Sequence, residues 1–171
     1  MALEGLPRAG ETGLNRRRLF QVIAIAGALA AYLTIIVGGD VRSSGAGMAC
    51  TDSWTLCNGT IVPDFSQPGV AIEFAHRVIA FTTSVLVLIT LILAFLWFRK
   101  DWRVMSLSVS TLALLFAQVL LGAVTVQTDL NPTIVTAHLA LGTATFATAL
   151  VLAVVALMPP PSRTTADIAP S

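Results

Sequence analysis

Residues 16–37 read RRRLFQVIAIAGALAAYLTIIV, and this stretch decides the fold class. Three arginines precede an uncharged run from Leu19 to Val37. A transmembrane helix needs about 20 mainly apolar residues to cross a hydrocarbon core of roughly 30 Å, and this run has that length. A basic segment before an apolar run is also typical of a secretory signal peptide. The run is longer than the apolar part of such a peptide and three similar runs follow, so we interpret it as a membrane helix.

The rest of the chain alternates between apolar segments and short polar ones. The further apolar segments cover about residues 70–98, 104–126 and 133–158. The joining segments are a loop at 38–69 rich in Gly, Ser, Asp and Pro, a basic turn at 99–103 and a polar turn at 127–132. This pattern predicts an all-α integral membrane protein with four transmembrane helices in one bundle.

The composition agrees with a chain surrounded by a lipid bilayer. Hydrophobic residues make up 56% of the sequence and charged residues 11%, whereas soluble domains carry about 25% charged residues. The net charge of +1 gives no basic footprint for nucleic acid, so no nucleic-acid partner is expected. We expect a membrane domain at 19–158, an N-terminal tail at 1–18 and a disordered C-terminal tail at 159–171.

Lysine and arginine are placed unevenly along the chain. Loops rich in these residues stay on the cytoplasmic side of a membrane. The cations expected on one side are Arg16–Arg18, Arg99, Lys100, Arg103 and Arg163. The other side has Arg42 in a loop, with Arg77 just inside a helix end. Both termini are therefore predicted to be cytoplasmic, in a multi-pass protein of the cell membrane whose loop 38–69 faces outward.

His76 and His138 are the only histidines in the chain. Each ends an I-x-x-A-H pattern, at 72–76 and 134–138, in the first turns of an inward-running helix. This similarity indicates two hairpins related by an axis along the membrane normal. At 1.5 Å per residue, both side chains lie roughly 8–9 Å below the outer boundary. An ionisable side chain at that depth is costly unless it is paired or ligated.

An interhelical hydrogen bond is the alternative role for a single membrane histidine. Two histidines at matched depth instead favour a haem held between both rings, because imidazole is a common axial ligand of haem iron. A zinc site is less favoured, since structural zinc takes four N or S ligands. The sequence therefore predicts that His76 and His138 bind haem iron near the outer face.

Glu73 and Arg77 flank the first histidine on the same helix face. Their spacing of four residues allows an ion pair, which would explain both side chains. In the alternative, the carboxylate serves as a base or stabilises positive charge at the porphyrin edge. The guanidinium would then hold a haem propionate through paired hydrogen bonds.

Cys50 and Cys57 are the only cysteines, and both lie in the outward loop. Thiols outside the cytoplasm tend to be oxidised, so a disulfide between them is expected. It either staples the loop or takes part in redox exchange near the cofactor. Trp54, which stands between the cysteines, is expected to pack at the membrane interface.

Several stretches carry residue patterns in a fixed order. They read GGDVRSSGAG at 38–47, WTLCNG at 54–59, EFAHR at 73–77, QVLLGAVTV at 118–126, and LNP at 130–132 followed by HL at 138–139. Together they resemble the motifs of the haem A synthases over about residues 36–140. Thr55 stands where that family has a proline. Most members are built as two four-helix halves, whereas this chain resembles one half, as in the compact archaeal-type members.

The resemblance implies an oxidoreductase that converts a methyl substituent of haem O to the formyl group of haem A, for cytochrome oxidase biogenesis. It implies that His76 and His138 ligate the iron of haem b, haem O or haem A. Glu73 would promote the oxidation by accepting a proton or stabilising a cationic intermediate, and Arg77 would anchor a propionate. Cys50 and Cys57 would stabilise the loop or relay reducing equivalents.

The half-size chain leaves the assembly open. One site serves both substrate and cofactor haem, or several copies assemble. Small residues in the first helix suit close contact in a homo-oligomer or packing within the bundle, namely Ala24, Ala26, Gly27, Ala28, Ala30 and Ala31. Other expected partners are haem O synthase and oxidase-assembly proteins. Two other functions stay open: a bis-histidine cytochrome b that carries electrons, and a haem chaperone for oxidase assembly.

Overall fold

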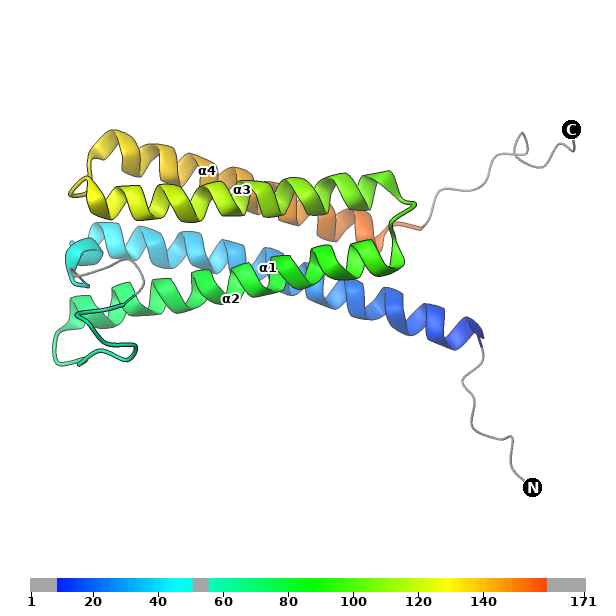
Figure 1. The fold of residues 1–171 in the computed structure, drawn as a ribbon, viewed down its shortest axis with the longest axis horizontal. Helices are drawn as coiled ribbons and strands as arrows, with labels where there is room; N and C mark the ends of the chain where they lie inside the picture. The colour runs from blue at the N-terminus through cyan, green and yellow to red at the C-terminus, as the bar shows by residue number, and fades with distance from the viewer. Residues whose placement is uncertain (1–8, 51–55, 160–171) are drawn as a thin grey trace, which may run out of the picture.

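The computed structural model describes residues 9–50 and 56–159, with side chains from residue 13 onward. In this part the chain forms four long helices and one short 3₁₀ helix (Figure 1). They are α1 (Ala9–Ser43), η1 (Ala46–Met48), α2 (Pro68–Trp97), α3 (Trp102–Gln127) and α4 (Pro132–Leu157). All four long helices are long and apolar enough to cross a membrane. The predicted all-α fold with four such helices is therefore confirmed.

Helix α1 extends beyond the apolar run Leu19–Val37 at both ends. It begins at Ala9, so residues 9–18 continue the same helix, and their location on the cytoplasmic side stays a prediction. Its basic turn is held against the bundle, because the Arg16 guanidinium lies over the Trp97 ring, 5.9 Å from the centroid. Once a helix is nucleated, each added residue gains a backbone hydrogen bond, so such contacts suffice to extend it.

The tight turns occur where the sequence supplies capping residues. Pro68 and Pro132 stand in the first turns of α2 and α4, where the missing N–H has no helical partner to lose. Asp101 caps α3 by accepting hydrogen bonds from the backbone N–H groups of Arg103 and Val104. These caps place the α2–α3 and α3–α4 turns close to their predicted positions.

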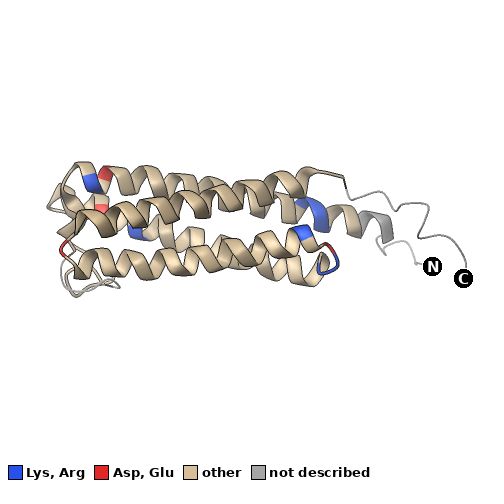
Figure 2. Cartoon of the chain, turned by 90° about the horizontal axis from the view of Figure 1, so that it is seen from above, with Lys and Arg blue, Asp and Glu red and all other residues tan. Residues whose placement is uncertain are grey.

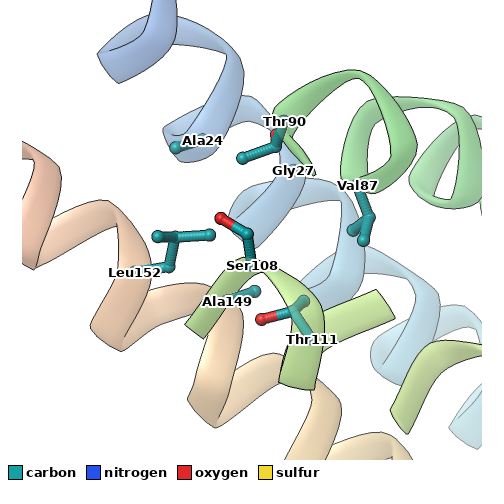
Figure 3. Close-up of a pocket in the computed structure, with 8 residues that line it drawn as sticks. All are labelled: Ala24, Gly27, Val87, Thr90, Ser108, Thr111, Ala149 and Leu152. Carbon is teal, nitrogen blue, oxygen red and sulfur yellow. The ribbon is translucent and has the colours of Figure 1, made fainter. Parts of the chain in front are cut away.

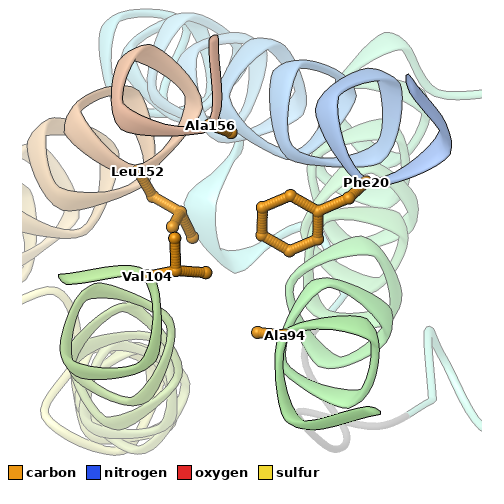
Figure 4. Close-up of a cluster of buried hydrophobic side chains, with 5 residues drawn as sticks. All are labelled: Phe20, Ala94, Val104, Leu152 and Ala156. Carbon is orange, nitrogen blue, oxygen red and sulfur yellow. The ribbon is translucent and has the colours of Figure 1, made fainter. Parts of the chain in front are cut away.

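The helices pack as two antiparallel hairpins, α1–α2 and α3–α4, that close into one bundle (Figure 1). Helix α1 lies against α2 and α4, and α3 lies against the same two helices. At the end that holds the start of α1, all four helices contribute to one apolar cluster (Figure 4). Its buried residues are Phe20, Ala94, Val104, Leu152 and Ala156. This cluster closes the end of the bundle opposite to the histidines.

Small residues join α1 to α4. Ala24 and Ala28 are buried against Ala149 and Ala153, and Ala31 is buried as well. Small side chains let helix backbones approach closely, which favours association in lipid, where the hydrophobic effect is absent. These alanines therefore pack within the bundle, one of the two roles that the sequence left open.

The pattern of buried residues repeats between the hairpins. Aligning α2 with α4 on their histidines pairs the buried residues Thr83 with Thr145, Val87 with Ala149, Thr90 with Leu152 and Ala94 with Ala156. Aligning α1 with α3 on Gly38 and Gly122 pairs Phe20 with Val104, Ala24 with Ser108, Gly27 with Thr111 and Ala31 with Leu115. The repeat that the I-x-x-A-H patterns indicated therefore extends along both hairpins, as expected for a pseudo-twofold axis.

Among the described residues, the charged ones lie toward the two ends of the bundle and leave its middle uncharged (Figure 2). One end carries the arginines of the first turns of α1, together with Arg99 and Lys100 of the α2–α3 turn. Arg163 lies outside the described residues. An uncharged middle is what a hydrocarbon core requires. The cytoplasmic location of the basic end stays a prediction.

Candidate functional site

His76 and His138 occupy equivalent positions of the repeat, near the starts of α2 and α4. Each ring lies on a glycine of the preceding helix. A Cβ at Gly38 would stand 2.9 Å from His76 Cε1, and a Cβ at Gly122 would stand 3.1 Å from His138 Cε1. Contacts of that length are far tighter than ordinary packing of a Cβ atom. Glycine therefore lets both imidazoles lie directly on a neighbouring helix backbone.

One ring nitrogen of each histidine lacks a protein partner. The Nδ1 atoms of His76 and His138 are buried and have no hydrogen-bond partner. His138 Nε2 lies 3.3 Å from Gln118 Nε2, while the Oε1 atom of the same glutamine is also buried and unpaired. Buried polar atoms are nearly always paired in native proteins, so several unpaired ones at one place are typical of a ligand-binding site.

The two imidazoles fit a haem better than an isolated metal ion. They lie at the same end of the bundle, near the starts of α2 and α4. Among the described residues, no three His, Cys, Asp or Glu side chains come together as a metal-binding group. Two imidazoles suit an iron whose remaining ligands come from a macrocycle. His76 and His138 are the residues that would hold a haem here.

Glu73 lies one turn before His76 and is only 4% exposed. Its Oε1 atom pairs with Nη2 of Arg77 at 2.6 Å, so the ion pair that the sequence allowed is confirmed. Its Oε2 atom accepts a hydrogen bond from the backbone N–H of Cys50 at 2.9 Å. A buried charge is costly unless it is paired and hydrogen-bonded, and both conditions are met here. The carboxylate is therefore held in a fixed orientation at the histidine end.

Arg77 joins α2 to the loop between α1 and α2. Its guanidinium donates hydrogen bonds to the carbonyls of Cys50 at 3.2 Å and Leu56 at 3.1 Å. A guanidinium carries five N–H donors in one plane, so it can serve a carboxylate and several carbonyls together. The role in holding a propionate stays a prediction for this residue.

Cys50 and Cys57 form the expected disulfide. The two residues are 0% and 2% exposed and pack with Val70 in a small cluster of their own. Thiol exchange requires access to a sulfur atom, so this burial favours the structural role over redox exchange. Trp54 lies outside the described residues.

The hydrogen-bonded group formed by Glu73, Arg77 and the backbone of Cys50 has no counterpart among the described residues of the second hairpin. On α4, the apolar residues Val135 and Leu139 stand where α2 has its carboxylate and guanidinium. The α3–α4 turn instead supplies Leu130, which packs on η1: a Cβ at Gly47 would stand 3.0 Å from Leu130 Cδ1. The outer loop therefore reaches both hairpins, through polar contacts on α2 and an apolar contact on the α3–α4 turn.

A small cavity of about 10 Å³ lies between the four helices, away from the histidines (Figure 3). It is lined by four pairs related by the repeat: Ala24 and Ser108, Gly27 and Thr111, Val87 and Ala149, and Thr90 and Leu152. Its three hydroxyl groups donate hydrogen bonds to carbonyls of their own helices. This volume is at the lower limit for one water molecule. The cavity marks the pseudo-twofold axis and is separate from the candidate site.

Sequence reasoning assigned no role to Gln118, Gly122 or Gly142. Gln118 and Gly122 stand in the QVLLGAVTV stretch, whose resemblance to a family motif was the one sequence feature that pointed to them. A Cβ at Gly142 would stand 2.8 Å from Gln118 Nε2. Contacts of this kind depend on how α3 and α4 pair, which a single sequence does not give.

Comparison with known proteins gives a consistent result. Residues 64–170 match the family model described as cytochrome oxidase assembly protein. Similar curated proteins are named Heme A synthase, for example those of Bacillus cereus (strain AH187) and Bacillus anthracis (strain A0248). Each is 27% identical over 136 residues, which is 80% of this chain and 44% of the relative. The chain thus spans less than half the length of these relatives. No solved structure matches it significantly.

Proposed function

Because the chain belongs to the cytochrome oxidase assembly protein family, we propose that it is a haem A synthase-type oxidoreductase, which converts haem O to haem A. The observation that carries this proposal is the pair His76 and His138, set at equivalent positions with buried, unpaired Nδ1 atoms. The naming of the curated relatives supports the same reaction. In the proposal, the product supports cytochrome oxidase biogenesis.

The proposed reaction oxidises a ring methyl to a formyl group. In this proposal the methyl carbon gains its oxygen atom from water, the displaced hydrogens leave as protons, and the electrons pass to an external electron acceptor, which the reaction requires. His76 and His138 would hold the haem iron through their imidazoles, and the bound haem supplies the redox-active iron and the methyl group. Gly38 and Gly122 let both rings lie on the helix backbones, which limits their freedom to turn.

Glu73 is the catalytic residue in this proposal. Its carboxylate would stabilise positive charge that develops on the substrate, or accept a proton from it. The backbone N–H of Cys50 and the guanidinium of Arg77 already hold both carboxylate oxygens. A charge held in this way needs little reorganisation during a reaction, which is how electrostatic stabilisation is most effective. Arg77 would also anchor a propionate at the helix end.

Because the chain is short, the proposed reaction could use one haem site in a single chain or two haem sites in different chains. In one, a single site takes haem O and acts without a second haem. In the other, copies assemble so that one chain holds a cofactor haem and another holds the substrate. Haem content per chain and the mass of the detergent-solubilised protein separate them, because only the second arrangement requires an oligomer.

We place the protein in the cell membrane as a multi-pass protein, with both termini in the cytoplasm and the histidine end outward. Four helices able to cross a membrane and the basic residues at the opposite end support this placement. Haem O reaches such a site from the bilayer. Haem O synthase and oxidase-assembly proteins are the partners that we expect.

One observation favours a second function, that of a bis-histidine cytochrome b. Cys50 and Arg77 occupy both oxygens of Glu73, so this carboxylate can also have a purely structural role that links α2 to the outer loop. An electron carrier needs two axial histidines and no catalytic carboxylate.

Haem extraction with mass analysis separates these functions. The protein is expressed in a host with a haem O source and in one without it. Haem A or an oxidised haem O intermediate, formed only with the source, supports the synthase. Haem b alone under both conditions supports the carrier. Binding of haem O without conversion supports a chaperone. His76→Ala and His138→Ala serve as controls, because each removes one proposed iron ligand.

A further inference from the structure

Gln118 is the one side chain within hydrogen-bond distance of a histidine ring nitrogen among the described residues. It stands on α3 one turn before Gly122, and its Nε2 atom lies 3.3 Å from His138 Nε2. Its Oε1 atom is buried without a partner. The side chain thus brings both a donor and an acceptor to the ring of His138, and only one of them is in use.

A glycine on the facing helix makes room for this amide. A Cβ at Gly142 of α4 would stand 2.8 Å from Gln118 Nε2 and 3.5 Å from Cδ of the same side chain. Such a contact would move the end of a flexible side chain and leave the backbone in place. Gly142 therefore controls whether the amide can reach His138.

The repeat shows that this contact is particular to one histidine. Thr34 of α1 is the counterpart of Gln118, because it stands one turn before Gly38. Its hydroxyl lies 2.9 Å from the hydroxyl of Thr83, and no hydrogen bond between the Thr34 side chain and His76 occurs among the described residues. An amide side chain such as that of Gln118 can turn and can donate or accept.

We propose that Gln118 is a positioning residue that sets the orientation of the His138 imidazole. The lack of a side chain at Gly142 provides the space that the Gln118 amide occupies. The proposal deepens the proposed function, since it assumes that His138 binds haem. Groups that hydrogen-bond a metal-ligating histidine fix its tautomer and ring orientation, and their loss costs about 10–100-fold in metal affinity or activity. The two proposed ligands would therefore differ in their support, because only His138 has an adjustable amide side chain beside its ring.

The first test uses the protein without haem, so it stands even if the proposed function fails. Histidine labelled with ¹⁵N reports the ring nitrogens of His76 and His138, which His138→Ala assigns. Gln118→Met keeps the length of the side chain and removes its hydrogen bonds. We expect the His138 signals to shift and those of His76 to stay. Unchanged His138 signals, or equal shifts at both histidines, would overturn the proposal.

The second test uses the haem-loaded protein. Gln118→Met is expected to weaken haem binding about 10–100-fold in a titration and to shift the midpoint potential, with thermal stability near that of the wild type. Gly142→Ala is expected to do the same by displacing the amide. The matched control is Gly27→Ala, whose added Cβ would meet its nearest atom at an ordinary 3.8 Å.

Combining the substitutions separates positioning from packing. In Gln118→Ala, the atom that a Cβ at Gly142 would strike is gone, so adding Gly142→Ala is expected to weaken haem binding no further. Residues that act through one contact give such non-additive effects. Additive losses would mean that the two positions only pack the helices, and the proposal would fail. Absence of haem binding by the wild type would refute the proposed function, and the ¹⁵N test alone would then decide the role of Gln118.

Discussion

The carboxylate of Glu73 accepts a hydrogen bond from the backbone N–H of Cys50, with 2.9 Å between Oε2 and N and a separation of 23 residues in the sequence. One bond thus links the helix that carries His76 to the loop closed by the disulfide. The same carboxylate pairs with Arg77, which donates to the loop carbonyls in turn. Any change at Glu73 is therefore expected to affect both the proposed chemistry and the loop.

Two substitutions of Glu73 separate these effects. Glu73→Gln keeps an acceptor for Cys50 but removes the charge and the ion pair with Arg77, so we expect a folded protein of lowered stability that produces no haem A. Glu73→Ala also leaves the buried N–H of Cys50 unpaired and is expected to cost about 1–3 kcal/mol of stability. Thermal unfolding and haem analysis of both variants provide the check. Full haem A production by Glu73→Gln would exclude a catalytic carboxylate.

Removal of the disulfide is expected to lower stability and leave activity in place. Cys50 and Cys57 close a short loop, for which chain entropy accounts for about 2–3 kcal/mol. The double variant Cys50→Ser/Cys57→Ser is compared with the wild type by thermal unfolding and by haem A yield below the unfolding temperature. Lost haem A production at unchanged stability would instead assign a redox role to the pair.

Gly38→Ala is expected to abolish the bis-histidine haem spectrum. The added methyl would stand 2.9 Å from His76 Cε1 and push the ring from its position. The neighbouring Gly39→Ala is a matched control, because a Cβ there meets no atom within 4 Å. Absorption spectra of the two purified variants measure haem content and spin state. Equal spectra for both would show that the ring is not held by Gly38.

The orientation of the bundle can be tested with reporters. We expect a reporter that works only in the cytoplasm to be active when it is fused to either terminus. A reporter that works only outside should be active when it is inserted after Val62, an exposed position between α1 and α2. The opposite pattern would place the histidines at the cytoplasmic face and would contradict the orientation inferred from Lys and Arg.

The sequence was sufficient for the helices, the disulfide and the matched placement of the histidines, because each leaves a local signal. Apolar length marked the four helices, whereas α2 and α4 begin at Pro68 and Pro132, slightly before the starts expected at about residues 70 and 133. The extension of α1 to Ala9 left no apolar signal, because residues 9–18 are mostly polar or small.

The polar contacts of the site were less accessible to sequence reasoning. The pairing of Glu73 with Arg77 follows from helix spacing, and it was among the alternatives. The bond from Cys50 to Glu73 depends on how the loop returns over α2. The contact of Gln118 with His138 depends likewise on the register between two helices.

The repeat has a consequence for how the two hairpins recognise each other. Their backbones are alike, but paired interior positions carry unlike side chains, as Phe20 and Val104 do in the apolar cluster (Figure 4). A dimer that paired α1–α2 of one chain with α1–α2 of another would bring two copies of Phe20 together where the bundle pairs Phe20 with Val104. Overfilling a packed interior costs about 1–3 kcal/mol. Unequal volumes at matched positions thus favour the pairing of α1–α2 with α3–α4 over the pairing of two like hairpins.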